Sequence, residues 1–91
     1  MRDDRFKWDD RKAATNLRKH DVSFDLARLV FDDPMALDEL DDEESEDRFA
    51  RLGMVNGVLL MVIYTQRRDR IRIISARKAD KNEQTDYFRF P

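Results

Sequence analysis

The sequence predicts a single α+β domain over residues 1–91, in which two N-terminal helices pack on a small antiparallel sheet. Two observations predict this class. The first half contains two helix caps, and the second half contains a β-branched apolar run, Val58 to Thr65, directly after an Asn56-Gly57 turn. The expected order of elements is β-α-α-β-β-β, followed by a short helical tail.

Local signals set the bounds of these elements. Asp9 or Asp10 caps the first helix and Ser23 caps the second, because their side-chain oxygens accept hydrogen bonds from the first free N–H groups. The second helix ends before Pro34, since the residue preceding a proline disfavours the helical backbone. The expected elements are a strand at Phe6–Trp8, helices at Arg11–His20 and Phe24 to about Phe31, and strands at Arg48–Val55, Val58–Thr65 and Arg70–Arg77.

The composition excludes several classes of protein. Charged residues make up 42% of the chain and hydrophobic residues 41%, and the absence of cysteine excludes disulfides, thiol catalysis and cysteine-based zinc sites. The longest apolar run, Val58 to Tyr64, is too short for a membrane helix. No apolar segment follows the first residues, so we expect a cytoplasmic protein without a signal peptide, a membrane partner, a metal or a cofactor.

The charges are unevenly distributed. Eight of the ten residues from Asp38 to Asp47 are acidic, so the other 81 residues hold 18 basic and 12 acidic side chains. A basic surface suits RNA or an acidic partner, although arginine-rich strands also keep a small sheet in solution. The acidic segment is interpreted first as a solvated loop. The alternatives are an RNA mimic that shields the arginines, a contact for basic residues of a partner, and, least favoured, a Ca²⁺ or Mg²⁺ site.

The predicted hairpins bring arginines together. The tight turn places Arg48 opposite Thr65, and the four-residue loop that follows places Thr65 opposite Arg70. Because side chains alternate between faces, Arg48, Arg70 and Arg72 gather at one end of one face. Their mutual repulsion gives folding no reason for the cluster, which therefore predicts an anion site. Arg77 falls on the opposite face and joins them only if its strand bulges.

The middle of the predicted sheet is apolar on both faces. Two short helices can cover only one face, and the polar tail is too short to cover the other. We therefore expect an apolar strip of Leu52, Met61 and Ile74 to bind a partner, with the neighbouring arginines selecting an acidic segment of it.

A set of short strings runs through the chain. The first half contains Phe6-Lys7-Trp8-Asp9, Lys12, Asn16, Lys19-His20, Val22-Ser23-Phe24, Ala27 and Val30-Phe31-Asp32-Asp33-Pro34. The second half contains Arg48, Gly53, Arg72-Ile73-Ile74-Ser75-Ala76-Arg77-Lys78-Ala79, Glu83 and Tyr87. In this order and spacing the chain resembles the BrnT toxins over nearly its whole length.

That resemblance implies a fold similar to the RelE toxins and a cytoplasmic, metal-independent ribonuclease that inhibits translation. It also implies inhibition by a BrnA-type antitoxin, a ribbon-helix-helix protein, so that DNA is contacted only through the antitoxin. Two positions depart from the family pattern. Asp21 stands where a glycine usually ends the first helix in the left-handed conformation, which aspartate tolerates. The segment Glu44-Ser45-Glu46 replaces His-Ser-Glu, which leaves His20 as the only histidine.

Metal-free RNA cleavage needs a base for the 2′-hydroxyl, positive charge for the transition state and an acid for the leaving oxygen. Arg48, Arg72 and Arg77 are the candidates for the charge. His20 is the candidate acid or base, although a cation at the end of a helix also has a purely structural reason. The resemblance adds Tyr87, in a tail that covers the catalytic face. The further residues expected to contact RNA are Lys19, Arg70 and Lys78. The alternative function is a non-catalytic module that binds RNA or protein through the basic strands.

Overall fold

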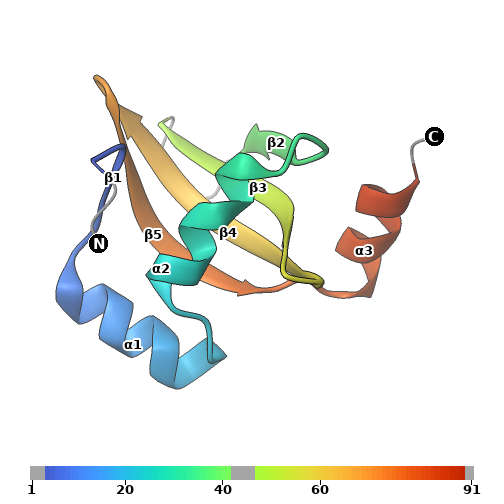
Figure 1. Ribbon diagram of the computed structural model, residues 1–91, viewed down its shortest axis with the longest axis horizontal. Coiled ribbons are helices and arrows are strands. Elements are labelled where there is room, and N and C mark those ends of the chain that lie inside the picture. The colour runs from blue at the N-terminus through green and yellow to red at the C-terminus, as the bar shows by residue number, and fades with distance from the viewer. Residues whose placement is uncertain (1–3, 42–46, 90–91) are drawn as a thin grey trace.

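The computed structural model describes residues 4–41 and 47–89. It has the predicted α+β class, with two N-terminal helical segments, a sheet and a C-terminal helix (Figure 1). The elements in chain order are β1 (Phe6–Lys7), α1 (Asp10–His20), α2 (Phe24–Ala27), the 3-10 helix η1 (Arg28–Asp32), β2 (Leu37–Leu40), β3 (Arg48–Val55), β4 (Val58–Arg67), β5 (Arg70–Lys78) and α3 (Lys81–Phe88).

The sheet is larger than the sequence predicts, and it is mixed. Its strand order is β1-β5-β4-β3-β2, with β1 parallel to β5 and the other neighbours antiparallel. The additional strand, β2, lies at the start of the segment that the sequence assigned to a solvated acidic loop. It forms because Asp38 lies opposite Arg51, whose guanidinium Nη2 is 3.1 Å from the Asp38 carboxylate. The acidic residues at 42–46 lie outside the described residues.

The predicted caps of the N-terminal helices are confirmed. Asp9 accepts hydrogen bonds from the N–H groups of Arg11 and Lys12, and Ser23 accepts one from the N–H of Leu26. Asp21 takes the left-handed conformation, with φ 58° and ψ 34°. The second helix is shorter than expected, because after Ala27 the chain tightens into the 3-10 turns of η1 before it reaches Pro34.

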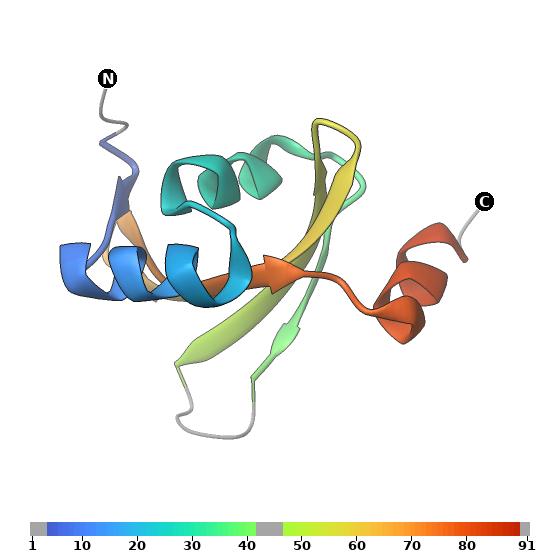
Figure 2. The same cartoon turned by 90° about the horizontal axis from the view of Figure 1, so that it is seen from below.

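One face of the sheet carries the main hydrophobic core; we call it the helix face. The helices α1 and α2 lie against it, whereas α3 lies on the other side of the twisted sheet (Figure 2). The packing is close where η1 crosses β3, since a Cβ on Gly53 would lie 2.9 Å from the Cβ of Val30. The buried core residues of this face are Phe6, Val22, Phe24, Ala27, Val30, Val55, Leu60, Val62, Ile73 and Ala76.

A buried asparagine attaches α1 to β5. The side chain of Asn16 donates to the carbonyl of Ala76 at 2.8 Å and accepts from the N–H of the same residue at 3.0 Å. It also donates to the carbonyl of Val22 at 3.0 Å. Since β1 pairs only with Ile71 and Arg72, Asn16 satisfies backbone groups farther along β5.

The strand register is confirmed for one hairpin and wrong for the other. Arg48 lies opposite Thr65 as predicted, but Thr65 lies opposite Arg72 instead of Arg70. The strands extend farther than expected, so the connection shrinks to two residues, of which Arg68 has φ 54°. The shift aligns Arg48, Thr65 and Arg72 across three neighbouring strands.

A β-bulge then changes the faces along the rest of β5. The register shifts between Ile63 and Tyr64, which leaves Ile74 as the additional residue. Beyond it, Ala76 turns into the helix face, where it is buried, and Arg77 turns to the other face, opposite Met61. The assignment of Ala76 and Arg77 to faces is therefore the reverse of the regular alternation expected from the sequence.

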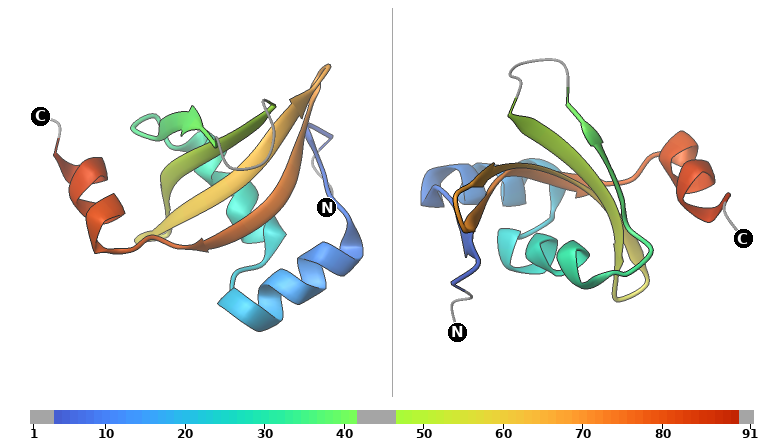
Figure 3. Two further views of the ribbon diagram at one scale, coloured as in Figure 1. Left: turned by 180° about the vertical axis from the view of Figure 1, so that it is seen from behind. Right: turned by 90° about the horizontal axis from the view of Figure 1, so that it is seen from above.

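We call the opposite side of the sheet the second face; Figure 3 (left) looks onto it. The expectation that its apolar strip is uncovered is wrong, because Leu52 and Met61 are only 4% and 7% exposed. Leu37 of β2 and Tyr87 of α3 pack against them. Ile74 does not belong to this cluster and lines a hollow beside α1. No helix within 4–41 and 47–89 is long and apolar enough to cross a membrane.

Candidate functional site

Four polar residues form a row across the second face, which we call the basic row: Lys7, Arg72, Thr65 and Arg48. They come from β1, β5, β4 and β3. The chain neighbours of these residues, Phe6, Ile73, Tyr64 and Phe49, pack on the helix side, so alternation turns the basic row to the second face. The row therefore unites residues from both ends of the chain at one edge of the fold.

The basic row has more positive charge than its surroundings neutralise. Arg72 is half-buried and Lys7 is exposed, and neither makes an ion pair with any residue in the described ranges. Arg48 is held differently, because its Nε lies 3.4 Å from the carboxylate of Asp41. Asp41 belongs to the acidic segment, so at this position the segment shields an arginine.

The basic row adjoins a wide hollow of about 690 Å³. Lys7 and Thr65 of the row line it together with Arg67 and Arg70, which pair at the ends of β4 and β5. Arg70 lies two residues before Arg72 on β5, opposite Arg67 and not, as the sequence predicts, opposite Thr65. Arg68 and two carboxylates, Asp47 and Asp69, line the hollow as well, so its lining holds four basic and two acidic side chains.

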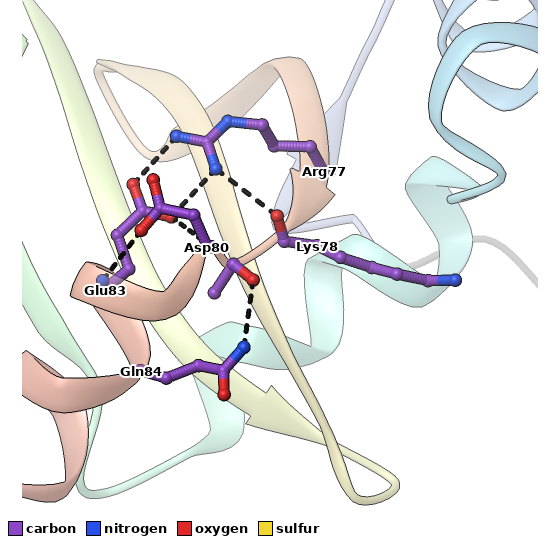
Figure 4. A network of polar contacts seen from close by, with 6 residues as sticks. Arg77, Lys78, Asp80, Glu83 and Gln84 are labelled. Atoms are coloured by element: carbon purple, nitrogen blue, oxygen red, sulfur yellow. Dashed lines mark hydrogen bonds and ion pairs between the residues drawn. The ribbon is translucent and has the colours of Figure 1, made fainter.

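Arg77 lies elsewhere on β5 and is paired with a carboxylate. Its guanidinium donates two hydrogen bonds of 2.8 Å to the carboxylate of Glu83 in α3. The side chain of Lys78 points the other way (Figure 4). The hydrogen bond and charge of Arg77 lower the pKa of Glu83 although burial opposes them, and Glu83 in turn raises the pKa of Arg77. Asp80 and Glu83 also form a capping box at the start of α3. This pair attaches α3 to the sheet.

Tyr87 belongs to a second attachment of α3. Its hydroxyl donates to Asp33, which also accepts from the backbone N–H groups of Met54 and Met35. Burial raises the pKa of Asp33, but these hydrogen bonds outweigh it and the pKa is lowered overall. The hydrogen bond to Asp33 raises the pKa of Tyr87 to about 12, so the phenol stays protonated at neutral pH.

Tyr87 is far from the basic row. Met54, whose N–H shares the Asp33 carboxylate with Tyr87, is six residues along β3 from Arg48, which corresponds to roughly 20 Å in an extended strand. The structure therefore does not bring Tyr87 together with Arg48 and Arg72. It brings Tyr87 and Arg77 together instead, as the two attachments of α3.

His20 and Lys19 occupy a third location, at the end of α1. Both are exposed, and they line a hollow of about 300 Å³ with Ile74 and Ser75 of β5. Ile74 and Ser75 follow Arg72 along β5, and Asn16, one turn before His20, contacts Ala76, four residues beyond Arg72, so His20 lies away from the basic row. The structure therefore does not bring His20 together with Arg48 and Arg72, because the end of α1 lies farther along β5, in the direction of α3.

Sequence reasoning missed four residues. Lys7 joins the basic row through the parallel pairing of β1 with β5, which no local sequence signal predicts. Thr65 could be placed between Arg48 and Arg72 only with the correct register of β4 against β5. The sequence indicated Asp33 only as the residue that ends the second helix, and Asn16 only as one of the residues that resemble the family. An asparagine on the apolar side of a thin helix stripe is a signal for a buried polar contact, and it was present at Asn16.

The described carboxylates and His20 are spread over the fold. Within 4–41 and 47–89, no three histidine, aspartate or glutamate side chains come close enough together to hold a metal ion. The carboxylates at 42–46 lie outside these ranges.

The fold and the basic row define a class: a small α+β protein whose sheet carries a row of basic side chains at one end of its second face. The chain matches the family model described as "Ribonuclease toxin, BrnT, of type II toxin-antitoxin system" over residues 8–83. It belongs to this family, which confirms the resemblance. No match to the chain was found among curated protein sequences.

Proposed function

We propose that this BrnT-family protein is a metal-independent endoribonuclease that cleaves RNA at the basic row and thereby inhibits translation. One observation carries the proposal: Arg48 and Arg72 flank Thr65 in adjacent strands, and Arg72 has no carboxylate partner in the described ranges. A phosphodiester held between two guanidinium groups has its negative charge neutralised in the ground state and, more strongly, in the transition state.

Each of these residues has a separate role in the proposed reaction. Arg48 and Arg72 bind the scissile phosphate and stabilise the charge that develops during in-line attack by the 2′-hydroxyl. His20, at the end of α1, remains the candidate general acid or base for RNA that extends along β5 from the basic row, with Lys19 contacting a neighbouring phosphate. Arg70 extends the binding surface along the wide hollow.

Arg77 and Tyr87 border the RNA path at the α3 end, whereas Lys78, which lies opposite Leu60 on the helix face, can contact RNA only if the RNA passes round the edge of the sheet. Arg77 lies opposite Met61, four residues along β4 from Thr65, or roughly 13 Å from the basic row. Because Tyr87 remains protonated, its hydroxyl acts as a hydrogen-bond donor that holds α3 beside the RNA. Another group must abstract the proton from the 2′-hydroxyl.

The antitoxin is proposed to be of the BrnA type, with a ribbon-helix-helix fold that carries the DNA contacts of the complex. Its docking position is the second face, where an apolar hollow of about 330 Å³ remains between β2, β3, β4 and α3. Leu52 and Met61 line this hollow, and Glu39 and Asp86 lie at its rim. An antitoxin segment seated there would block the path from α3 to the basic row.

The test is incubation of the purified protein with RNA, followed by gel analysis and identification of the new ends. Cleavage with 2′,3′-cyclic phosphate ends supports the proposal. Inhibition of translation while the RNA stays intact would instead support a non-catalytic binding module. For the antitoxin, calorimetric titration of Asp86→Lys and Arg72→Glu, with Arg18→Glu as a control on the exposed side of α1, shows which surface it covers.

A further inference from the structure

The hydroxyl of Thr65 lies in an unusual position. The residue is only 8% exposed, and its Oγ1 has no hydrogen-bond partner among the residues that the structure describes. A buried hydroxyl without a partner destabilises a fold, so most such groups are hydrogen-bonded. Valine has nearly the same shape and at least as high a preference for strands, so folding alone favours valine at this position.

The two residues opposite Thr65 in the neighbouring strands are both arginines, which favours an anion between them. Thr65 lies between Arg48 and Arg72 in the adjacent strands, where directly opposite side chains have Cβ atoms about 5 Å apart. It also lines the hollow of about 690 Å³ beside the basic row. A 120° rotation about χ1 moves the hydroxyl to another staggered position, so a single rotamer change can turn it toward the hollow.

We propose that the Thr65 hydroxyl donates a hydrogen bond to a non-bridging oxygen of the phosphate that Arg48 and Arg72 hold. This assignment rests on the proposed ribonuclease function and adds a substrate-binding residue to it. The arginine side chains are long and mobile, whereas threonine has a single rotatable bond and stands on a central strand of the sheet. Thr65 therefore determines where the phosphate sits, and the arginines supply the charge.

The experiment compares Thr65→Val, which removes the hydroxyl and keeps the shape, with Thr65→Ser, which keeps the hydroxyl. For each variant the cleavage rate, the melting temperature and the affinity for a 2′-deoxy oligonucleotide that cannot be cleaved are measured. We expect Thr65→Val to bind and cleave about tenfold to a hundredfold more weakly, the range for a hydrogen bond to a charged group, with an unchanged or higher melting temperature. Thr65→Ser is expected to stay within about threefold of the wild type.

Salt dependence separates this hydrogen bond from charge. Thr65→Val should leave the slope of log affinity against log salt unchanged, because it removes no charge. Arg72→Ala should reduce the slope by about 0.7, the value for one phosphate contact on a single strand. An equal slope with a lower affinity is a result that a purely structural role of Thr65 does not produce.

Three outcomes overturn the assignment: wild-type affinity and cleavage in Thr65→Val, an equal loss in Thr65→Ser, or a loss that follows a lower melting temperature in Thr65→Val. Failure of the proposed function looks different. In that case the wild type does not cleave RNA at all, and the affinities for the uncleavable oligonucleotide still decide whether Thr65 contacts a phosphate.

Discussion

Arg72 and Arg77 stand five residues apart on β5 and both reach the second face, yet the protein uses their charges differently. Arg77 is neutralised by a forked ion pair with Glu83, and this pair holds α3. Arg72 lies between Thr65 and Lys7 without a carboxylate partner in the described ranges. The comparison shows that the charge of Arg77 is used to hold the fold together, whereas the charge of Arg72 stays available for substrate binding.

The largest effect is expected for Arg72→Ala. The substitution removes positive charge from the phosphate site, so RNA cleavage should fall about a hundredfold or more, the usual loss for one transition-state donor. The melting temperature should be unchanged or slightly higher, because a repelling charge leaves the basic row. Cleavage assays and thermal unfolding check this, with Arg18→Ala as the control for loss of an exposed arginine. Full activity of Arg72→Ala would show that the basic row is not the site.

The attachment of α3, to which both Arg77 and Tyr87 contribute, is tested by Tyr87→Phe. The variant loses the hydrogen bond to the ionised Asp33 and should lower the free energy of unfolding by about 1–2 kcal/mol. Urea denaturation measures the change, and Phe88→Leu on the exposed side of α3 is the matched control. If both substitutions have equal effects, the hydroxyl of Tyr87 does not anchor α3.

A smaller effect, dependent on pH, is expected for Glu83→Gln. The pKa of Glu83 is lowered in the folded protein, so its ionised form stabilises the fold above the ordinary value of 4.5 and this contribution is lost as the pH falls through the lowered pKa. At neutral pH the variant should be about 1 kcal/mol less stable, because the partner Arg77 is partly exposed. The difference from the wild type should disappear in acid. A difference that persists at low pH would mean that the charge of Glu83 is not responsible.

The smallest effect is expected from chelation. If cleavage takes place at the basic row, excess EDTA should leave its rate unchanged, since guanidinium groups and not a metal ion stabilise the transition state. Loss of cleavage in EDTA and its recovery with Mg²⁺ would move the chemistry to the acidic segment.

Much of the fold could be predicted because its signals are local. Asp9 and Ser23 cap helices through their own side chains, and the Asn56-Gly57 turn determines the pairing of β3 with β4. The strand β2 was missed since a dense acidic segment repels itself in isolation, and only the arginines of β3 make a strand there favourable. The burial of Leu52 and Met61 was missed as a consequence, because residues of β2 and α3 pack against them.

The candidate site was predictable in kind and not in detail. The sequence placed Arg48 and Arg72 on one face near one end, and the structure agrees. It could not place Lys7, whose strand pairs in parallel with a segment more than sixty residues away. It also assigned Arg77 and Arg72 to opposite faces, whereas the bulge in β5 turns both to the second face and the two differ in that Arg77 has a carboxylate partner.

The sequence by itself determined the class of the fold, the caps and one hairpin register, because each depends on residues that are neighbours in the chain. It also determined the family, through strings that extend over most of the chain. Only the tertiary structure decided which arginines keep an unneutralised charge, because that depends on where Asp41, Glu83 and Lys7 arrive. The alignment of Arg48, Thr65 and Arg72 was likewise decided by the register of β5 against β4, where a shift of two residues moves a side chain by about 7 Å.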